Sequence, residues 1–299
     1  MRAVRVAMPL VASLVLLITL ATCLALTLAQ DRYVGGLRLP YFSDMGRDPP
    51  SYYVFSVGLT VVALAIFATW VLNFVYQLAS LRLRVRRGLM GKSVRCWSVL
   101  VLVLGVLSTP ALPILSICST TACPDVHLFA TFWFFVLETL AIVINTCIMY
   151  KLLRVVRRAP VVEGSDGADL NQRTRQRLNA TVALQSTCAV VLVLAALVFV
   201  PIGTAIAGPT PRLPVQACLA KKLGVQYCTS TMRDDGTDLT KLWDYEQNWE
   251  LHQARAVCEW LAMLALVGYS LSFLLYQDHE ADSARAAGRR DLEASLLPS

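Results

Sequence analysis

The chain has 299 residues, of which 56% are hydrophobic and only 16% are charged, and its mean hydropathy is +0.57. Charge is too scarce and apolar residues are too frequent for an ordinary soluble domain or a disordered chain. The net charge of +7 comes without a groove-binding motif or interleaved aromatic residues, so the sequence makes no case for nucleic acid as a partner. The composition therefore predicts a membrane protein.

Six apolar runs follow one another along the chain. Each is long enough to cross a hydrocarbon core of about 30 Å, which takes roughly 20 helical residues. We therefore predict an all-α, polytopic membrane protein, with a bundle of six transmembrane helices in residues 1–278 and a cytoplasmic tail at 279–299. Residues 1–29 could instead be a signal peptide, since Thr27 and Ala29 fit the small-residue cleavage rule, but their apolar region is too long. The predicted spans are residues 7–29, 52–78, 96–117, 128–150, 179–207 and 256–277.

Lysine and arginine are concentrated in the loops that follow spans two and four. The segments after spans one and five are balanced in charge, with three bases against three acids and six against six. Because cytoplasmic loops carry the excess of Lys and Arg, both basic loops and both termini are predicted to be cytoplasmic. The basic residues are Arg82, Arg84, Arg86, Arg87, Lys92 and Arg95 in the first loop, and Lys151, Arg154, Arg157, Arg158, Arg173, Arg175 and Arg177 in the second.

The same basic loops can bind the anionic lipids of the cytoplasmic leaflet, at about 1 kcal/mol for each Lys or Arg near the surface. The favoured interpretation is that they only set the topology, because the positive-inside bias alone requires such loops. Membrane lipids are the predicted partners, and anionic lipids at the basic loops are the second, less favoured interpretation. The cytosolic protein partners are not identified by the sequence.

A polar, proline-braced loop at residues 39–50, here called the motif loop, separates spans one and two and reads LPYFSDMGRDPP. Ser43 and Asp44 can bond to their own backbone, and Gly46 permits positive φ. The two closing prolines prevent regular backbone pairing. We therefore predict a rigid turn that caps a membrane helix. Its marked residues are Pro40, Tyr41, Ser43, Asp44, Gly46, Pro49 and Pro50.

A three-residue motif, Cys258, Glu259 and Trp260, lies near the start of span six. Glu259 lies about one helical turn into the span. Two interpretations are open, because an interfacial carboxylate can reach the headgroups as long charged side chains do, or it can have a functional role.

The motif loop resembles the loop that follows the first span in the Frag/DRAM/Sfk family of six-span membrane proteins, which has the form PYISDTGxxPPE. Met45 and Ser51 depart from this form, where the family has Thr and Glu, so a role of that Glu is not carried over. Residues 257–278 are similar to the last span of the DRAM (damage-regulated autophagy modulator) branch, and His127 is a third, weaker match. The family match includes Glu259, which supports its functional interpretation as much as the interfacial position supports the other, so both stay open.

The resemblance implies a six-span protein of endolysosomal or plasma membranes that promotes autophagy. Other members of the wider family are linked to remodelling of GPI-anchor lipids, which would suit the Golgi, or to organising phosphoinositide kinase at the plasma membrane. Glu293, Leu296 and Leu297 in the tail approximate an acidic dileucine sorting signal, for which chance is an equally good explanation.

Polar residues inside the predicted spans are few. Glu138 lies about halfway through span four, where an ionised carboxylate costs about 2.5 to 3.5 kcal/mol, so we expect it to be protonated or to face the bundle interior. Asn73, Asn145 and Gln185 share one depth near the cytoplasmic ends of their spans. They predict an interhelical hydrogen-bond layer, favoured here as a structural contact of about 0.6 kcal/mol per bond over part of an ion, proton or lipid path.

Four of the nine cysteines fall on the predicted non-cytoplasmic side, where disulfides persist. Two local bridges, two bridges between loops, or free thiols are all open. The candidates are Cys118, Cys123, Cys218 and Cys228.

The long segment after span five ends with an expected interfacial helix from Leu239 onward, since Leu242, Tyr245 and Trp249 have helical spacing. Its tryptophans, Trp243 and Trp249, suit the headgroup zone.

The sequence contains no nucleophile elbow, phosphate-cradling glycine loop, zinc-ligand cluster or carboxylate pair. We therefore predict no catalytic residue, metal ligand or cofactor. The favoured hypothesis is a non-catalytic membrane protein, most simply of lysosomes or endosomes. Lipid handling is the alternative, and a channel or proton-coupled transporter that uses Glu138 is a third.

Overall fold

The computed structural model describes residues 2–86, 93–158, 165–208 and 210–296. Among these residues, six helices are long and apolar enough to cross a membrane, so the predicted bundle of six spans is confirmed. A helix satisfies its own backbone hydrogen bonds, which lipid cannot do. The spans are Ala3–Ala29, Ser51–Leu78, Ser93–Ile117, Pro124–Arg158, Arg175–Ile206 and Trp249–Leu275.

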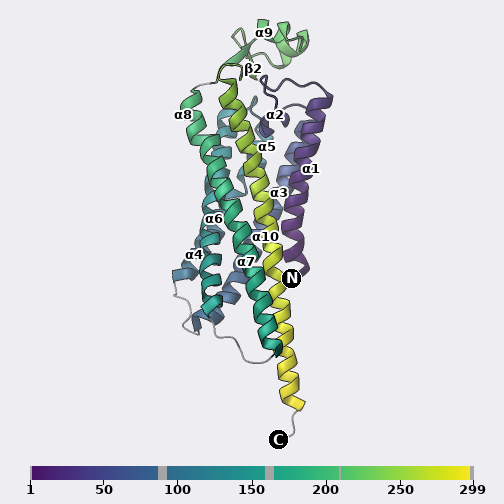
Figure 1. Ribbon diagram of the computed structural model, residues 1–299. Coiled ribbons are helices and arrows are strands. Elements are labelled where there is room, and N and C mark those ends of the chain that lie inside the picture. Colours follow the sequence, from purple (N-terminus) through teal and green to yellow (C-terminus); the bar gives the residue numbers. More distant parts are fainter. Residues whose placement is uncertain (1, 87–92, 159–164, 209, 297–299) are drawn as a thin grey trace.

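The long helices stand side by side in an elongated bundle (Figure 1). Each packs against the next in chain order, and the last packs against both its predecessor and the first, so the spans form a closed ring. The helices of this ring are α1 (Arg2–Ala29), α3 (Ser51–Arg86), α4 (Ser93–Ser108), α6 (Pro124–Arg158), α7 (Ser165–Leu197) and α10 (Trp249–Leu296).

Prolines interrupt two of the spans, as their missing N–H and fixed φ lead one to expect. In span three, α4 ends before Pro110 and the chain continues as α5 (Ala111–Ile117). In span five, Pro201 lies in the π-helix η1 (Val198–Ile202), which joins α7 to α8 (Gly203–Ala207).

One end of the bundle carries the motif loop, with its single-turn helix α2 (Phe42–Met45), and a small folded segment before α10 (Figure 1). That segment has its own core around a disulfide between Cys218 and Cys228, with Leu213, Met232 and Leu242 packed against it. Its elements are β1 (Arg212–Pro214), α9 (Val215–Ala220), η2 (Tyr227–Thr231) and β2 (Leu239–Trp243).

The expected interfacial helix from Leu239 onward is wrong over residues 239–248. Residues Leu239–Trp243 form β2, which pairs antiparallel with β1, Arg212 opposite Trp243 and Pro214 opposite Leu239. Thr240 and Leu242 are both completely buried, which is the period of two of a strand. Helix α10 begins only at Trp249.

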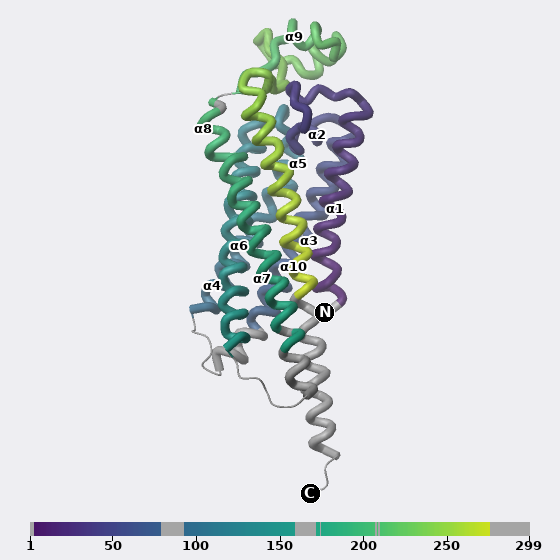
Figure 2. Tube along the Cα trace, viewed as in Figure 1, coloured from purple at the N-terminus to yellow at the C-terminus, as the bar shows by residue number. Residues whose placement is uncertain are grey.

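The opposite end of the bundle holds the start of α1 and the point near Leu275 where the last span ends (Figure 2). Helix α4 begins and helix α6 ends at that same end. The length of the bundle therefore separates the motif loop and the disulfide-bonded segment from the basic residues at the start of α4 and the end of α6.

Candidate functional site

The two segments that resemble the family are far apart in the sequence but contact each other in the fold. The Glu259 carboxylate on α10 accepts a hydrogen bond from the backbone N–H of Phe42, with 2.7 Å between Oε2 and the nitrogen. One residue further along α10, the indole N–H of Trp260 donates to the carbonyl oxygen of Pro40 at 3.0 Å. Span six therefore binds the backbone of the residues before and after Tyr41.

Local geometry explains why a carboxylate is needed there. Tyr41 is extended, with φ −61° and ψ 141°, and the helical turn α2 starts at the next residue. The first N–H groups of a helix have no partner within it, and a negative charge near them is favourable. Glu259 supplies that partner and is only 3% exposed, so its side chain turns into the protein rather than out to the interface.

Asp44 is the second buried carboxylate of this site, at 4% exposure. Its Oδ1 accepts from the Thr120 hydroxyl at 3.2 Å, and its Oδ2 accepts from the Tyr245 hydroxyl at 2.8 Å. Burial, together with the nearby charge of Asp44 and its hydrogen bond, raises the pKa of Tyr245 well above its ordinary value. Asp44 thus joins the motif loop to the loop after span three and to the segment that follows β2.

Arg47 and Asp48 form a buried ion pair within the motif loop, with 3.0 Å between Nη2 and Oδ2. Burial alone would lower the pKa of Arg47, but the Asp48 carboxylate and its hydrogen bonds raise it above the ordinary value. The Tyr227 hydroxyl in η2 donates to Asp48 at 3.0 Å, and Arg47 also donates to the carbonyl oxygen of Tyr33 at 2.9 Å. The pair therefore ties the motif loop to the disulfide-bonded segment.

The remaining marked residues of the motif loop fill space around these bonds. The Tyr41 hydroxyl lies 3.1 Å from Nδ1 of His252 on α10, and burial raises the pKa of Tyr41. A Cβ on Gly46 would lie 2.3 Å from the Phe55 ring, so only glycine fits against that ring. Pro40 is buried, Ser43 is half-buried, and Pro49 and Pro50 are exposed before α3.

The two positions that depart from the family form also have places in the packing. Met45 is 2% exposed and belongs to the core, and Ser51 begins α3 and is 3% exposed. The carbonyl oxygen of Ser51 accepts a weak bond from the thiol of Cys23 on α1. His127 is buried on α6, where Nδ1 lies 2.8 Å from the carbonyl oxygens of both Leu115 and Cys118. Two acceptors assign the proton to Nδ1.

Glu138 is 4% exposed and faces the interior of the bundle, as one of its two predicted alternatives requires. The Trp70 indole N–H lies 3.1 and 3.3 Å from its two oxygens, and the Ser108 hydroxyl lies 2.6 Å from Oε2. Spans two, three and four therefore meet at this carboxyl group.

The predicted hydrogen-bond layer forms in part. The Asn145 side-chain oxygen accepts from Asn73 at 3.0 Å and from Gln77 at 2.6 Å, and its Nδ2 donates to the Tyr269 hydroxyl at 2.7 Å. Gln185 does not join this group directly. It donates to Ser272, one turn from Tyr269 on α10, at 3.1 Å.

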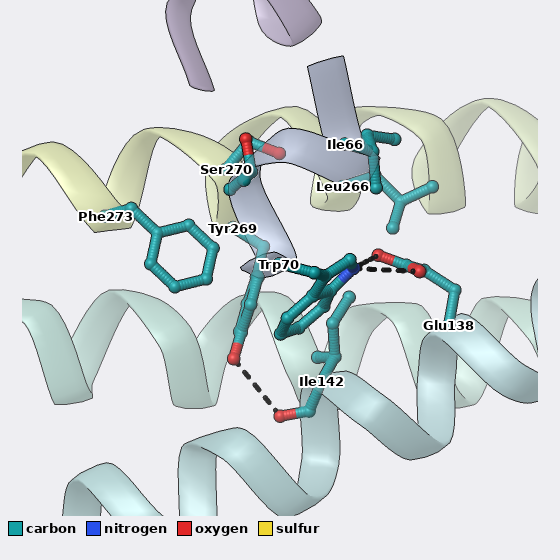
Figure 3. A pocket seen from close by; sticks show the side chains of 9 residues that line it. Ile66, Trp70, Glu138, Ile142, Leu266, Tyr269, Ser270 and Phe273 are labelled. Atoms are coloured by element: carbon teal, nitrogen blue, oxygen red, sulfur yellow. Dashed lines mark hydrogen bonds between the residues drawn. The ribbon is translucent and has the colours of Figure 1, made fainter. Parts of the chain in front are cut away.

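A cavity lies between Glu138 and this layer, with Trp70 and Tyr269 in its wall (Figure 3). It leaves about 10 Å³ for the centre of a water molecule. A water site needs about that much space and two or more polar partners, so the cavity can hold a single water. Figure 3 shows Trp70 turned to Glu138 while Tyr269 turns to the carbonyl of Ile142.

Sequence reasoning did not single out several residues that complete these sites. Trp70, Tyr245 and Tyr269 read as apolar side chains, and their polar atoms become important only once a buried partner is known. Thr120, Tyr227 and His252 belong to segments whose neighbours a single sequence does not reveal.

Among the four candidate disulfide cysteines, the structure joins Cys218 to Cys228 as a local bridge and leaves Cys118 and Cys123 as thiols. Cys258 on α10 is also a thiol. In the basic loops, the side chains of Arg82, Arg84, Arg86, Arg87 and Lys92 lie outside the described residues, and so do those of the dileucine-like signal at Glu293, Leu296 and Leu297.

These features define a six-span membrane protein in which a buried carboxylate on the last span holds the loop that follows the first. The model of the Frag1/DRAM/Sfk1/Cwh43P N-terminal domain matches residues 5–275, nearly the whole chain. The chain belongs to that family. Searches of curated proteins and of solved structures found no match.

Proposed function

We propose that this chain is a non-catalytic membrane protein of endosomes or lysosomes that modulates autophagy. Family membership and the resemblance of its two motifs to the DRAM branch support this role. The non-catalytic role is supported by the burial and hydrogen bonding of the carboxylates in the motif loop and in span six. Asp44, Asp48 and Glu259 are all buried, and each is held by donors of the protein itself. Groups used in this way stabilise a loop and are not presented to a substrate.

The proposal places the motif loop and the disulfide-bonded segment in the lumen, with both termini and both basic loops in the cytosol. Two observations support this orientation. A disulfide persists in an oxidising compartment, and Cys218–Cys228 lies at the motif-loop end. The excess of Lys and Arg lies at the other end, where the positive-inside rule puts the cytosol. The cytosolic partners would be proteins that bind the basic loops and the tail.

Lipid handling is the second candidate, because the basic loops would meet the anionic leaflet. Arg154 and Arg157 at the end of α6 are exposed there. In this role the protein would remodel GPI-anchor lipids or organise phosphoinositide kinase.

Localisation and flux distinguish the two candidates. A tagged full-length protein should colocalise with lysosomal markers, and its loss should change autophagic flux. Residence in the Golgi with altered GPI-anchor chains, or residence at the plasma membrane with altered phosphoinositide levels, would favour lipid handling instead. A reporter fused after Ser299 tests the orientation separately, and its detection in the lumen would contradict it.

A further inference from the structure

The short connection between α5 and α6 brings two thiols together at the end of the bundle that carries the motif loop. Cys118 follows the last residue of α5, and Cys123 directly precedes α6. The Cys118 thiol lies beside the Cys123 thiol, and burial together with this neighbour raises the pKa of Cys118. Cys118 is half-buried and Cys123 is exposed, so a reagent in the adjoining compartment can reach the pair.

The backbone holds both cysteines in these positions. The Cys118 N–H donates to the carbonyl oxygen of Ile114 at 2.9 Å, and the Cys123 N–H donates to that of Ser119 at 3.1 Å. Nδ1 of His127 binds the carbonyl oxygen of Cys118 from the first turns of α6. The closeness of the two thiols is therefore a consequence of how the ends of α5 and α6 are fixed.

The same end of the molecule already holds a disulfide, Cys218–Cys228. Disulfides persist where the compartment is oxidising, and small segments outside the membrane depend on them. Cys118 and Cys123 lie at this end of the bundle too and face the same compartment. Cys218 and Cys228 of the disulfide-bonded segment are already paired with each other. Each of the two thiols therefore has the other beside it as a partner.

We propose that Cys118 and Cys123 are a redox site. Its oxidation to a disulfide fixes the position of Thr120, the loop residue that is hydrogen-bonded to Asp44. The oxidant is the disulfide of a thiol–disulfide oxidoreductase or of oxidised glutathione. The thiolate of one cysteine attacks that disulfide and expels one sulfur as a thiolate, which leaves a mixed disulfide. The second cysteine then attacks the mixed disulfide and expels the other sulfur. The protein loses two protons and two electrons in all, and the donor disulfide takes them up to become two thiols.

The link to the motif loop is Thr120, which lies inside the ring that the bond would close. Its hydroxyl donates to Oδ1 of Asp44 at 3.2 Å. Within the same turn, Ser119 accepts from the N–H of Ala122 at 3.2 Å. A covalent ring removes conformations in which Thr120 leaves Asp44, so oxidation strengthens the hold on the motif loop.

Peptide mapping tests the bond itself. Full-length protein in its native membranes is alkylated without reductant, digested and analysed by mass spectrometry. We expect a peptide with Cys118 linked to Cys123, unlabelled and lighter by two hydrogen atoms than its reduced form, beside the linked Cys218 and Cys228. Alkylation of both thiols in unreduced protein would overturn the proposal, and so would a link from either one to Cys218 or Cys228.

Hydrogen exchange tests the link to Asp44. A reductant would also open Cys218–Cys228, so the double variant Cys118→Ser, Cys123→Ser is used, with Cys147→Ser, an exposed thiol elsewhere on α6, as the matched control. We expect exchange of the Asp44 and Met45 amides about tenfold faster in the double variant, which corresponds to roughly 1.4 kcal/mol. Thr120→Val should reproduce that increase, and adding it to the double variant should contribute little more. Unchanged exchange in the double variant, with a faster rate in Thr120→Val, would overturn the link.

Discussion

The carboxylate of Glu259 binds the backbone N–H of Phe42, 217 residues away in the chain, at 2.7 Å. This bond joins the last span to the loop that follows the first, and α1 and α10 are neighbours in the closed ring. The two segments that resemble the family are thus the two halves of one structural site.

Replacing Glu259 should destabilise this end of the protein. In Glu259→Ala the Phe42 N–H is left buried without its partner, which costs about 1 to 3 kcal/mol. Glu259→Gln keeps an acceptor oxygen and should cost less. Thermal unfolding in detergent measures both, with Glu250→Ala, at an exposed position of the same helix, as the control. Equal melting temperatures for wild type and Glu259→Ala would contradict this role.

The bond between Tyr245 and Asp44 should show strong coupling. Hydrogen bonds to a charged group contribute about 1.5 to 3 kcal/mol, so Tyr245→Phe and Asp44→Ala should each lower the free energy of unfolding. The double variant should lose less than the sum of the two, because both remove the same 2.8 Å bond. A double-mutant cycle of unfolding free energies measures this term, and strict additivity would show that the bond contributes nothing.

Alkaline pH should loosen the site before it unfolds the spans. Burial, with the Asp48 carboxylate, raises the pKa of Tyr227 from 10.0 to about 12. A group whose pKa is raised in the folded state stabilises it fully below the unfolded value and loses that contribution as pH rises through the folded value. The stability of the disulfide-bonded segment should therefore fall between pH 10 and about 12. Amide exchange of η2 against pH follows this, and Tyr227→Phe should flatten the profile.

Two substitutions of Glu138 test whether this buried polar residue has a structural role inside the bundle. Glu138→Leu leaves the Trp70 indole N–H without its partner in an apolar interior and should cost about 1 to 3 kcal/mol. Glu138→Gln can accept from Trp70 and donate to Ser108, so it should unfold close to wild type. In reconstituted vesicles Glu138→Gln should leave any pH-dependent ion flux unchanged. Loss of such a flux in this variant would instead assign the carboxyl group to a transport path.

The spans could be predicted from the sequence because one property decides them. A run of about 20 apolar residues has few stable places other than the bilayer, whatever it packs against. The pairing of Asn73 with Asn145 followed from depth alone, since two polar groups at one level in an apolar medium bind each other. Gln185 was at a similar depth, but its side-chain amide donates to Ser272 on α10 instead.

The contacts between the motif loop and span six could not be predicted from the sequence in the same way. The partner of Glu259 is a backbone N–H, which every residue except proline carries, so no side-chain pattern points to it. Strand β2 was missed because its alternation is only five residues long, while Leu242, Tyr245 and Trp249 by chance keep a helical spacing. In both cases the deciding contact is long-range, and local pattern carries no information on it.

Tyr227 and Tyr245 reach inward from the outermost part of the chain to the two aspartates of the motif loop. An antibody fragment selected against residues 210–248 would therefore act on more than its epitope. If binding displaced that segment, both tyrosines would shift the motif loop, which Glu259 holds at the start of the last span. A reagent confined to one side of the bilayer thus has a direct mechanical connection to the helix that continues to the other side.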